Sequence, residues 1–194
     1  MARPLRGDAQ ANLDRILQVA AAAFAQPGSD TSMKAIAGAA GVGVGTLYRR
    51  FPTREDLVEA TYRSETAGLC DQAEKLLASL PPRHALGAWL EEFVDYMLVK
   101  DGMAEALSAI LDSRDGLRAA SRVKLREAVE TLLRAGRDAG AFRDVPAGDV
   151  LMGIGGITLI AAHEHQRELA SRLIEILTIG ISTCLLYTSP SPRD

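Results

Sequence analysis

The sequence is poor in aromatic residues and cysteine, and it has no hydrophobic run long enough to cross a bilayer. Aromatic residues make up 5% of the 194-residue chain, which has two cysteines and eight prolines. The longest apolar run, residues 150–162, is shorter than the roughly 20 residues that a bilayer requires. These absences exclude a disulfide framework, a collagen-like chain and a membrane-spanning helix. Because no charged-then-apolar leader opens the chain, we expect a cytoplasmic protein.

The composition itself favours helices. Hydrophobic residues make up 47% of the chain and charged residues 24%, close to the average of globular proteins. Alanine and leucine, which are strong helix formers, dominate the hydrophobic set. No alternating strand pattern and no internal repeat competes with helical periodicity. The sequence therefore predicts an all-α fold.

Charge is distributed unevenly along the chain. Residues 1–54 hold seven Lys/Arg against three Asp/Glu, a net charge of +4. The remaining residues hold 15 against 22, a net charge of −7. A basic N-terminal segment followed by an acidic remainder is expected when only the N-terminal segment binds a polyanion, because long-range electrostatic attraction steers such binding. Chance clustering is the alternative.

Apolar residues at three- and four-residue steps, with capping and breaking residues between them, divide the chain into helices. Ser32 and Thr53 stand where N-caps are needed, and Thr53 is followed by two acids in the first turn. Gly41, Pro52 and the pair 81–82 end elements. The predicted helices cover residues 8–26, 33–40, 44–50, 54–80, 83–100, 103–112, 114–139, 147–162 and 166–183.

A short helix, a glycine-containing turn and a second short helix form a helix-turn-helix, in which the second helix enters the DNA major groove. In the predicted second helix, Gly45 allows close backbone approach and Thr46 offers a hydroxyl and a methyl to a base. The Tyr48 hydroxyl can donate a hydrogen bond to a DNA phosphate, and Arg49 and its basic neighbours supply positive charge. A solvated three-helix subdomain is the alternative interpretation.

Residues 31–57 resemble the DNA-binding signature of the tetracycline-repressor (TetR) family, in the Gly-Thr-Leu-Tyr run, the following Phe51 and the capped long helix. The resemblance implies DNA contacts at Thr46 and Tyr48, a basic phosphate contact at Arg54 and a basic N-terminal arm. Gly43 departs from the family, where many members have a better capping residue such as Ser, and contacts near it would be mostly apolar. The DNA-binding residues predicted together are Arg3, Arg6, Ser32, Lys34, Val44, Gly45, Thr46, Tyr48, Arg49 and Arg54.

The resemblance also implies that the helical body binds a small-molecule effector and forms a homodimer. Bulky side chains gather on one predicted helix and just after it, where they line a pocket or pack as ordinary core. These candidate ligand-binding residues are Trp89, Phe93, Tyr96, Met97, Met103 and Leu107. The last two helices are the expected dimer interface, through Leu151, Ile154, Ile157, Thr158, Leu173, Ile176 and Leu177.

Two other patterns in the sequence resemble ligand sites only superficially. Gly153, Gly155 and Gly156 have no preceding strand and no following Lys-Ser/Thr, so they do not form a phosphate loop. His163 and His165 are two residues apart and point to nearly opposite sides of a helix, which disfavours a shared metal ion. Neither a nucleophile grouping nor metal-spaced cysteines stand out. We therefore predict no metal, no cofactor and no enzyme.

The chain ends in a Ser/Pro-rich stretch that abandons helical periodicity. Residues 184–194 resemble one reading frame of a transposon-end adapter used to prepare sequencing libraries, and we expect this tail, with Cys184, not to be native. The expected domains are thus an arm and helix-turn-helix at 1–54, a regulatory and dimerisation domain at 55–183, and the tail.

The sequence predicts a TetR-like transcriptional regulator in which the helix-turn-helix domains of two protomers bind a palindromic operator. In this hypothesis it is a repressor that an effector releases. The alternatives are a helical-bundle enzyme and a dimeric DNA-binding protein without a ligand.

Overall fold

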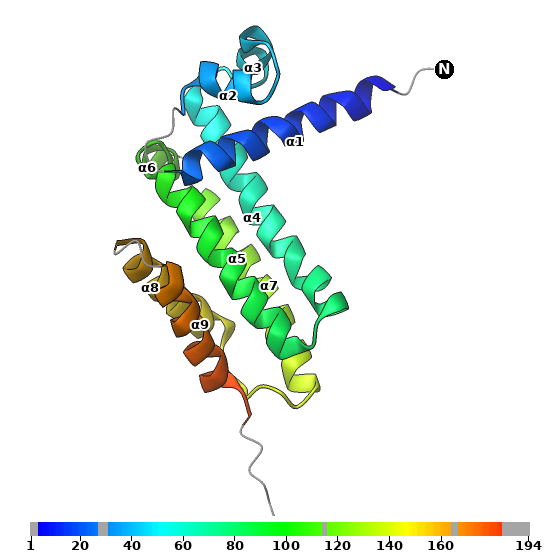
Figure 1. Cartoon of the computed structure of the whole chain (residues 1–194), viewed down its shortest axis with the longest axis vertical. Coiled ribbons are helices and arrows are strands. Elements are labelled where there is room, and N and C mark those ends of the chain that lie inside the picture. Colours follow the sequence, from blue (N-terminus) through cyan, green and yellow to red (C-terminus); the bar gives the residue numbers. More distant parts are fainter. Residues whose placement is uncertain (1–3, 27–30, 114–115, 164–166, 184–194) are drawn as a thin grey trace, which may run out of the picture.

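The computed structural model describes residues 4–26, 31–113, 116–163 and 167–183, and helices dominate this part of the chain (Figure 1). The prediction of an all-α fold is confirmed. The helices begin and end within a few residues of the predicted bounds. They are α1 (Pro4–Ala25), α2 (Met33–Ala39), α3 (Val44–Arg50), α4 (Arg54–Ser79), α5 (Pro82–Gly102), α6 (Ala104–Ser113), α7 (Leu117–Asp138), α8 (Ala147–His163) and α9 (Arg167–Ile181).

Local capping interactions set several of these bounds. The Ser32 hydroxyl accepts a hydrogen bond from the Ala35 backbone amide at 3.2 Å and so caps α2. Thr53 and Asp56 form a reciprocal capping box at the start of α4, with both backbone-to-side-chain bonds at 3.1 Å. Such caps satisfy amides that the first helical turn leaves without a partner. The first turn of α4 is therefore fixed directly after α3.

The molecule is elongated, with α2 and α3 at one end beside α1 (Figure 1). Helix α4 leads away from this end and packs against α5 and α7. Helices α8 and α9 pack on each other and on α5. One continuous core of buried side chains links these layers, and its fully buried members include Trp89, Leu90, Leu132, Leu133 and Ile154.

At two helix positions another part of the chain approaches so closely that only glycine fits. A Cβ atom at Gly102, the last residue of α5, would lie 1.7 Å from the carbonyl oxygen of Phe24 in α1. A Cβ at Gly136 in α7 would lie 1.9 Å from the Phe142 ring. The first contact sets α1 directly on the end of α5. It therefore helps to place the N-terminal helices on the body.

The end of α9 is held by the segment that follows α7. The Arg143 amide donates to the Ile181 carbonyl, and the Thr183 amide donates to the Ala141 carbonyl, each at 2.9 Å. These bonds form a short antiparallel bridge between Phe142 and Ser182. The described chain ends there: the predicted non-native tail, residues 184–194 with Cys184, lies outside the described residues.

Candidate DNA-binding surface and effector cavity

The recognition surface is built by α2, a tight turn and α3. Gly41 has a φ of 65°, a left-handed conformation that glycine adopts without strain, and it turns the chain between the two helices. Ile36 of α2 and Leu47 of α3 are buried and anchor the helices on the core. Gly43 is the N-cap of α3, and it makes no side-chain capping bond, as its lack of a side chain requires.

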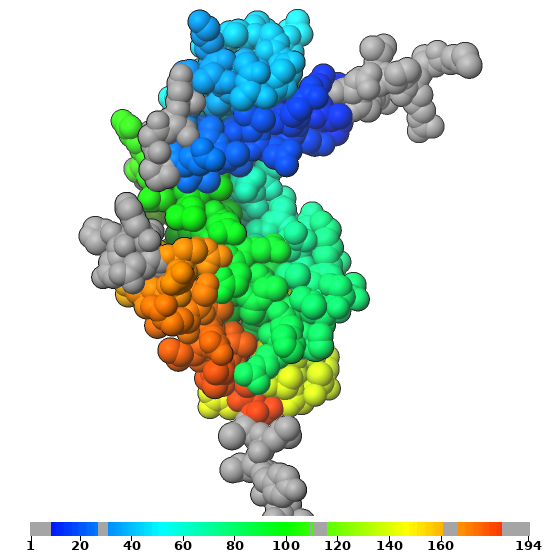
Figure 2. Space-filling model, viewed as in Figure 1, coloured from blue at the N-terminus to red at the C-terminus, as the bar shows by residue number. Residues whose placement is uncertain are grey.

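Helix α3 turns every side chain except Leu47 toward solvent. Tyr48 is 47% exposed, and Val44 is the other large apolar or aromatic residue on its exposed surface. The structure brings Val44, Gly45, Thr46, Tyr48 and Arg49 together on this one seven-residue helix. Exposed Ser32 and Lys34 belong to the neighbouring start of α2. Figure 2 shows these helices projecting at one end of the molecule, as a surface that enters a groove requires.

Arg54, predicted as a phosphate contact, is half-buried and engaged inside the protein. Its guanidinium donates to the backbone carbonyl of Thr31 and, at 2.8 Å, to the Thr31 hydroxyl. It also lies over the Phe24 ring, 5.4 Å from the centroid, which is within cation–π range. Arg54 thus ties the segment before α2 to α1 and α4, and its phosphate contact stays a prediction.

The predicted N-terminal arm is only partly within the described chain. Arg3 lies outside the described residues, and so does the side chain of Arg6, whose backbone is part of α1. The minor-groove contact of these two residues therefore stays a prediction.

A cavity of about 720 Å³ lies between α5, α7 and α8. Phe93, Tyr96 and Met97, three of the predicted ligand-binding residues, line it. Leu107 lines an adjoining hollow of about 200 Å³, together with Met97. The structure thus places these four predicted residues at hollows beside α5, and their contact with a ligand stays a prediction.

Trp89 and Met103 need correction, because they are core residues that line neither space. Trp89 is completely buried, and its Nε1 donates to the Leu69 carbonyl at 2.8 Å. A buried indole N–H needs a hydrogen-bond acceptor, and the Leu69 carbonyl inside the core supplies it. The Trp89 ring therefore packs in the core and does not line the cavity. Met103 is buried as well.

The cavity also contains residues that the sequence did not single out. Tyr62 reaches it from α4, and its ring centroid is 6.3 Å from that of Tyr96. The Tyr96 hydroxyl is 3.2 Å from that of Thr66, also on α4. Burial raises the pKa of Tyr96 well above its usual value, so its hydroxyl stays protonated. The cavity is therefore in direct contact with the helix that begins at the recognition surface.

Other residues missed in the cavity come from α7 and α8. They are small, basic and apolar in mixture, so no single periodicity indicates a pocket, although the arginines at four-residue steps on α7 are a usable signal. They include Arg118, Ser121, Arg122, Val123, Leu125, Arg126, Gly148, Leu151, Met152, Gly155, Gly156 and Leu159.

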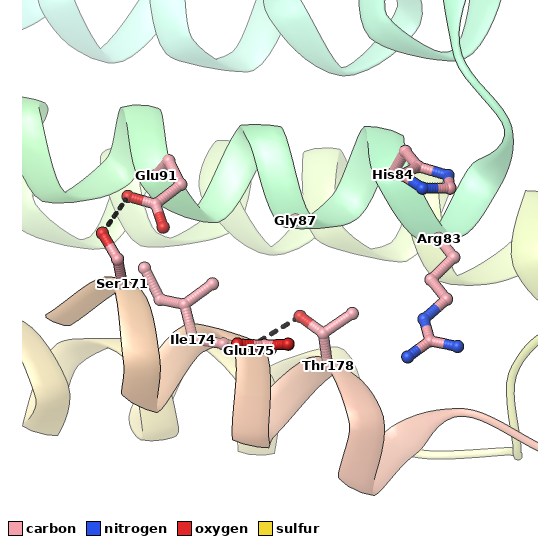
Figure 3. A pocket seen from close by; sticks show the side chains of 8 residues that line it. All are labelled: Arg83, His84, Gly87, Glu91, Ser171, Ile174, Glu175 and Thr178. Carbon is pink, nitrogen blue, oxygen red and sulfur yellow. Dashed lines mark hydrogen bonds between the residues drawn. The ribbon is translucent and has the colours of Figure 1, made fainter. Parts of the chain in front are cut away.

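A second hollow of about 370 Å³ lies between α5 and α9 (Figure 3). The Ser171 hydroxyl donates to Glu91 at 3.1 Å, and Arg167 pairs with the same carboxylate. Most of its lining residues are of polar types, and some of them are already bonded within the protein, whereas aromatic side chains line the cavity beside α8. The cavity beside α8 is therefore the better candidate for a small molecule.

The predicted dimer helices expose a set of apolar residues that shares Ile176 with the expected one and otherwise differs from it. Ile154 and Thr158 are corrected here: both are buried against the protomer's own core, where they have no free surface for a partner. Leu151, Ile157, Leu173 and Leu177 are half-buried. The exposed apolar residues of the two helices, which we call the α8–α9 face, are Met152 (76% exposed), Leu159 (72%), Ile160 (52%), Ile176 (64%) and Ile179 (52%). Met152 and Leu159 also line the cavity beside α8.

The described residues hold no group of three His, Cys, Asp or Glu side chains placed to bind a metal ion. The pattern that suggested one, His163 to His165, falls largely on residues 164–166, which lie outside the described chain. Within the part that the structure covers, no helix is long and apolar enough to cross a membrane.

Comparison with known proteins agrees with this architecture. The family model of bacterial regulatory proteins of the tetR family matches residues 16–61, and that of the SbtR-like transcriptional regulator C-terminal domain matches residues 81–183. No curated protein matches the chain. A TetR transcriptional regulator from Streptomyces coelicolor is 43% identical over 87% of this chain and 97% of its own, with a TM-score of 0.80.

A second solved structure, a TetR transcription regulatory protein from Mycobacterium vanbaalenii, is 29% identical over 93% of this chain and 100% of its own, with a TM-score of 0.75. The likeness to both structures covers the helical body as well as the recognition helices. This chain therefore belongs to the TetR family of DNA-binding transcriptional regulators.

Proposed function

We propose that the protein binds a palindromic operator as a homodimer and represses transcription until a small-molecule effector releases it. The observation that carries the DNA-binding part is the presentation of α3, which is held by buried Leu47 and exposes Thr46, Tyr48 and Arg49. These side chains supply base and phosphate contacts in a major groove. The net charge of +4 on residues 1–54 attracts the DNA backbone to this end.

The α8–α9 face supports the homodimer. Five large apolar side chains on two packed helices are more than half exposed there, which is costly in water unless another surface covers them. A second copy of the same chain is the occupant we propose, because a twofold axis makes such a patch its own complement. The same axis would present two recognition helices to a palindromic site.

The cavity beside α8 supports release by an effector. Tyr62 of α4 lines it, and α4 begins at Arg54, which bonds to Thr31 just before α2. A ligand that binds the DNA-incompetent arrangement more tightly shifts the population toward it, typically by about 1–3 kcal/mol. An open cavity also favours this function over a dimeric DNA-binding protein without a ligand.

The proposal is tested by selecting bound sequences from a random duplex pool with the full chain. We expect enrichment of a pseudo-palindrome whose half-sites lie about one helical turn, or about 34 Å, apart or a multiple of that. A pool that stays unenriched even at low ionic strength contradicts DNA binding. Enrichment of a single half-site contradicts the symmetric dimer.

Tyr48→Phe is expected to weaken binding at least about tenfold on the selected operator and on mismatched duplexes alike. The substitution removes one hydrogen bond to a phosphate, and such bonds to charged groups contribute about 1.5–3 kcal/mol. Gel shifts at a fixed salt concentration measure it. Unchanged affinity on every duplex would show that the exposed hydroxyl does not contact DNA.

Thr46→Ala is expected to lower the discrimination between the selected operator and single-base variants, because a base-edge contact is worth about 1–3 kcal/mol. The matched control is Thr131→Ala, which removes a hydroxyl that bonds to the Glu127 carbonyl of its own helix, α7, outside the recognition surface. The control should retain full discrimination. Equal behaviour of the two variants would contradict a role for Thr46 in base recognition.

A further inference from the structure

The cavity beside α8 has a positively charged wall. Lys100 lies in the last turn of α5, while Arg118, Arg122 and Arg126 follow one another at four-residue steps along α7. Residues four apart share a face of a helix, so the three guanidinium groups form a row along the cavity. No Asp or Glu is among the described residues that line it; Asp101, which follows Lys100, lines only the adjoining smaller hollow.

Among the described residues, pairing does not account for these four cations. None of them takes part in the ion pairs that the structure describes. The hollow of Figure 3, by contrast, combines Arg83 with Glu91 and Glu175. The chain beyond residue 54 has a net charge of −7, so a cluster of one positive sign is a local exception in an acidic body. Such a cluster raises the local concentration of anions.

The floor of the same cavity is aromatic and apolar. Phe93 and Tyr96 are buried with ring centroids 5.7 Å apart, and Met97 lies beside them on α5. The Tyr96 hydroxyl is already engaged by Thr66, so the rings offer mainly apolar surface. An apolar floor with charged groups on one wall is complementary to a molecule with an apolar body and one charged group.

We propose that this cavity binds an organic anion, with its apolar part on Phe93 and Met97 and its carboxylate or phosphate paired with Arg122 and Arg126. The inference rests on the proposed effector function and gives that effector its chemical class. The volume of about 720 Å³ is within the range of small-molecule sites, roughly 300–1,000 Å³. Arginine is suited to both head groups because its fork bonds carboxylates and phosphates in a bidentate manner.

Isothermal titration of the full chain without DNA tests the class, with decanoate, decyl phosphate and 4-phenylbutyrate as anionic probes. Decan-1-ol and decylammonium are the neutral and cationic counterparts of the same chain length. We expect at least one anion to bind at least about tenfold more tightly than both counterparts, with an affinity that falls as NaCl is raised. The comparison of decanoate with decyl phosphate identifies the preferred head group.

The variants Arg122→Gln and Arg126→Gln locate the site. Each is expected to weaken the preferred anion about tenfold while leaving decan-1-ol binding unchanged. The matched control is Arg134→Gln, an exposed arginine of the same helix that does not line the cavity, and it should bind like the parent chain. Because both lining arginines are exposed, their replacement by glutamine leaves the core intact, and thermal unfolding of each variant verifies this.

The inference is overturned if all three anions bind no better than decan-1-ol, if none binds with a Kd below about 1 mM, or if the lining variants bind like the control. Gel shifts with the selected operator separate this result from the proposed function. DNA binding without anion binding overturns the anion site alone. An anion that binds through Arg122 but leaves operator affinity unchanged supports the site and contradicts its role as effector.

Discussion

Leu159→Glu is expected to separate the homodimer into monomers and to abolish tight operator binding. Leu159 belongs to the α8–α9 face and also lines the cavity beside α8, but 72% of it is exposed in the single chain, so its further burial depends on the proposed partner. Burying a leucine stabilises by about 1.5–3 kcal/mol, and twofold symmetry applies the loss twice. Two carboxylates brought into an apolar interface add a desolvation cost. The dimer Kd should therefore rise at least about a hundredfold.

Analytical ultracentrifugation over a concentration series measures this dissociation constant. The matched control is Val44→Glu, which places the same charge on an exposed apolar residue of the recognition helix. Both variants should lose operator affinity, but only Leu159→Glu should lose the dimer. A dimer that persists in Leu159→Glu with unchanged affinity would show that the chain associates through another surface.

Gly102→Ala is expected to destabilise the protein by about 3 kcal/mol. Its Cβ would lie 1.7 Å from the Phe24 carbonyl oxygen, and a backbone atom cannot move aside as the end of a flexible side chain does. Overpacking of this kind costs about 1–3 kcal/mol, and a backbone clash belongs at the upper end. Urea unfolding followed by circular dichroism gives the change in the free energy of unfolding.

Gly87→Ala provides the control with the opposite sign. Gly87 is in the second turn of the same helix, α5, and a Cβ there would meet no atom within 4 Å. Alanine in a helix interior is favoured over glycine by about 0.5–1 kcal/mol, so this variant should be slightly more stable than the parent. Equal effects at both positions would indicate that α1 does not rest on α5 as described.

The helix bounds were predictable because their determinants are local. Ser32 and Thr53 cap the helices that follow them, and Gly41 adopts the left-handed conformation that its turn needs. Each of these interactions joins residues that are close in sequence. The recognition helix, α3, was predictable for the same reason, because its exposed residues and its buried Leu47 all lie within seven positions.

The cavity was only partly predictable because it joins helices that are far apart in the chain. Phe93 and Tyr96 were identified from bulk and spacing, but the same criterion selected Trp89, whose indole donates within the core. Nothing local distinguishes a side chain that lines a cavity from one that fills a core. Tyr62 became a candidate only when the fold placed α4 beside α5.

The dimer helices illustrate a limit of periodicity. Helix α8 is apolar on more than one side, so its sequence does not reveal which side the protomer itself covers. Ile154 and Thr158 prove to face the core, whereas Met152 and Leu159 face outward. The distinction depends on how α8 packs against α5 and α7, which is tertiary information.

The length of α4 has a mechanical consequence. Its 26 residues form one uninterrupted rod of about 39 Å, fixed at its first turn by the Thr53–Asp56 box. A tilt of only about 5° around the far end of such a rod carries its beginning, and the helices attached there, by about 3 Å. In a symmetric dimer the displacements of the two protomers add. A small movement at the far end of α4 therefore suffices to change the distance between the two α3 helices, so that they no longer match successive major grooves.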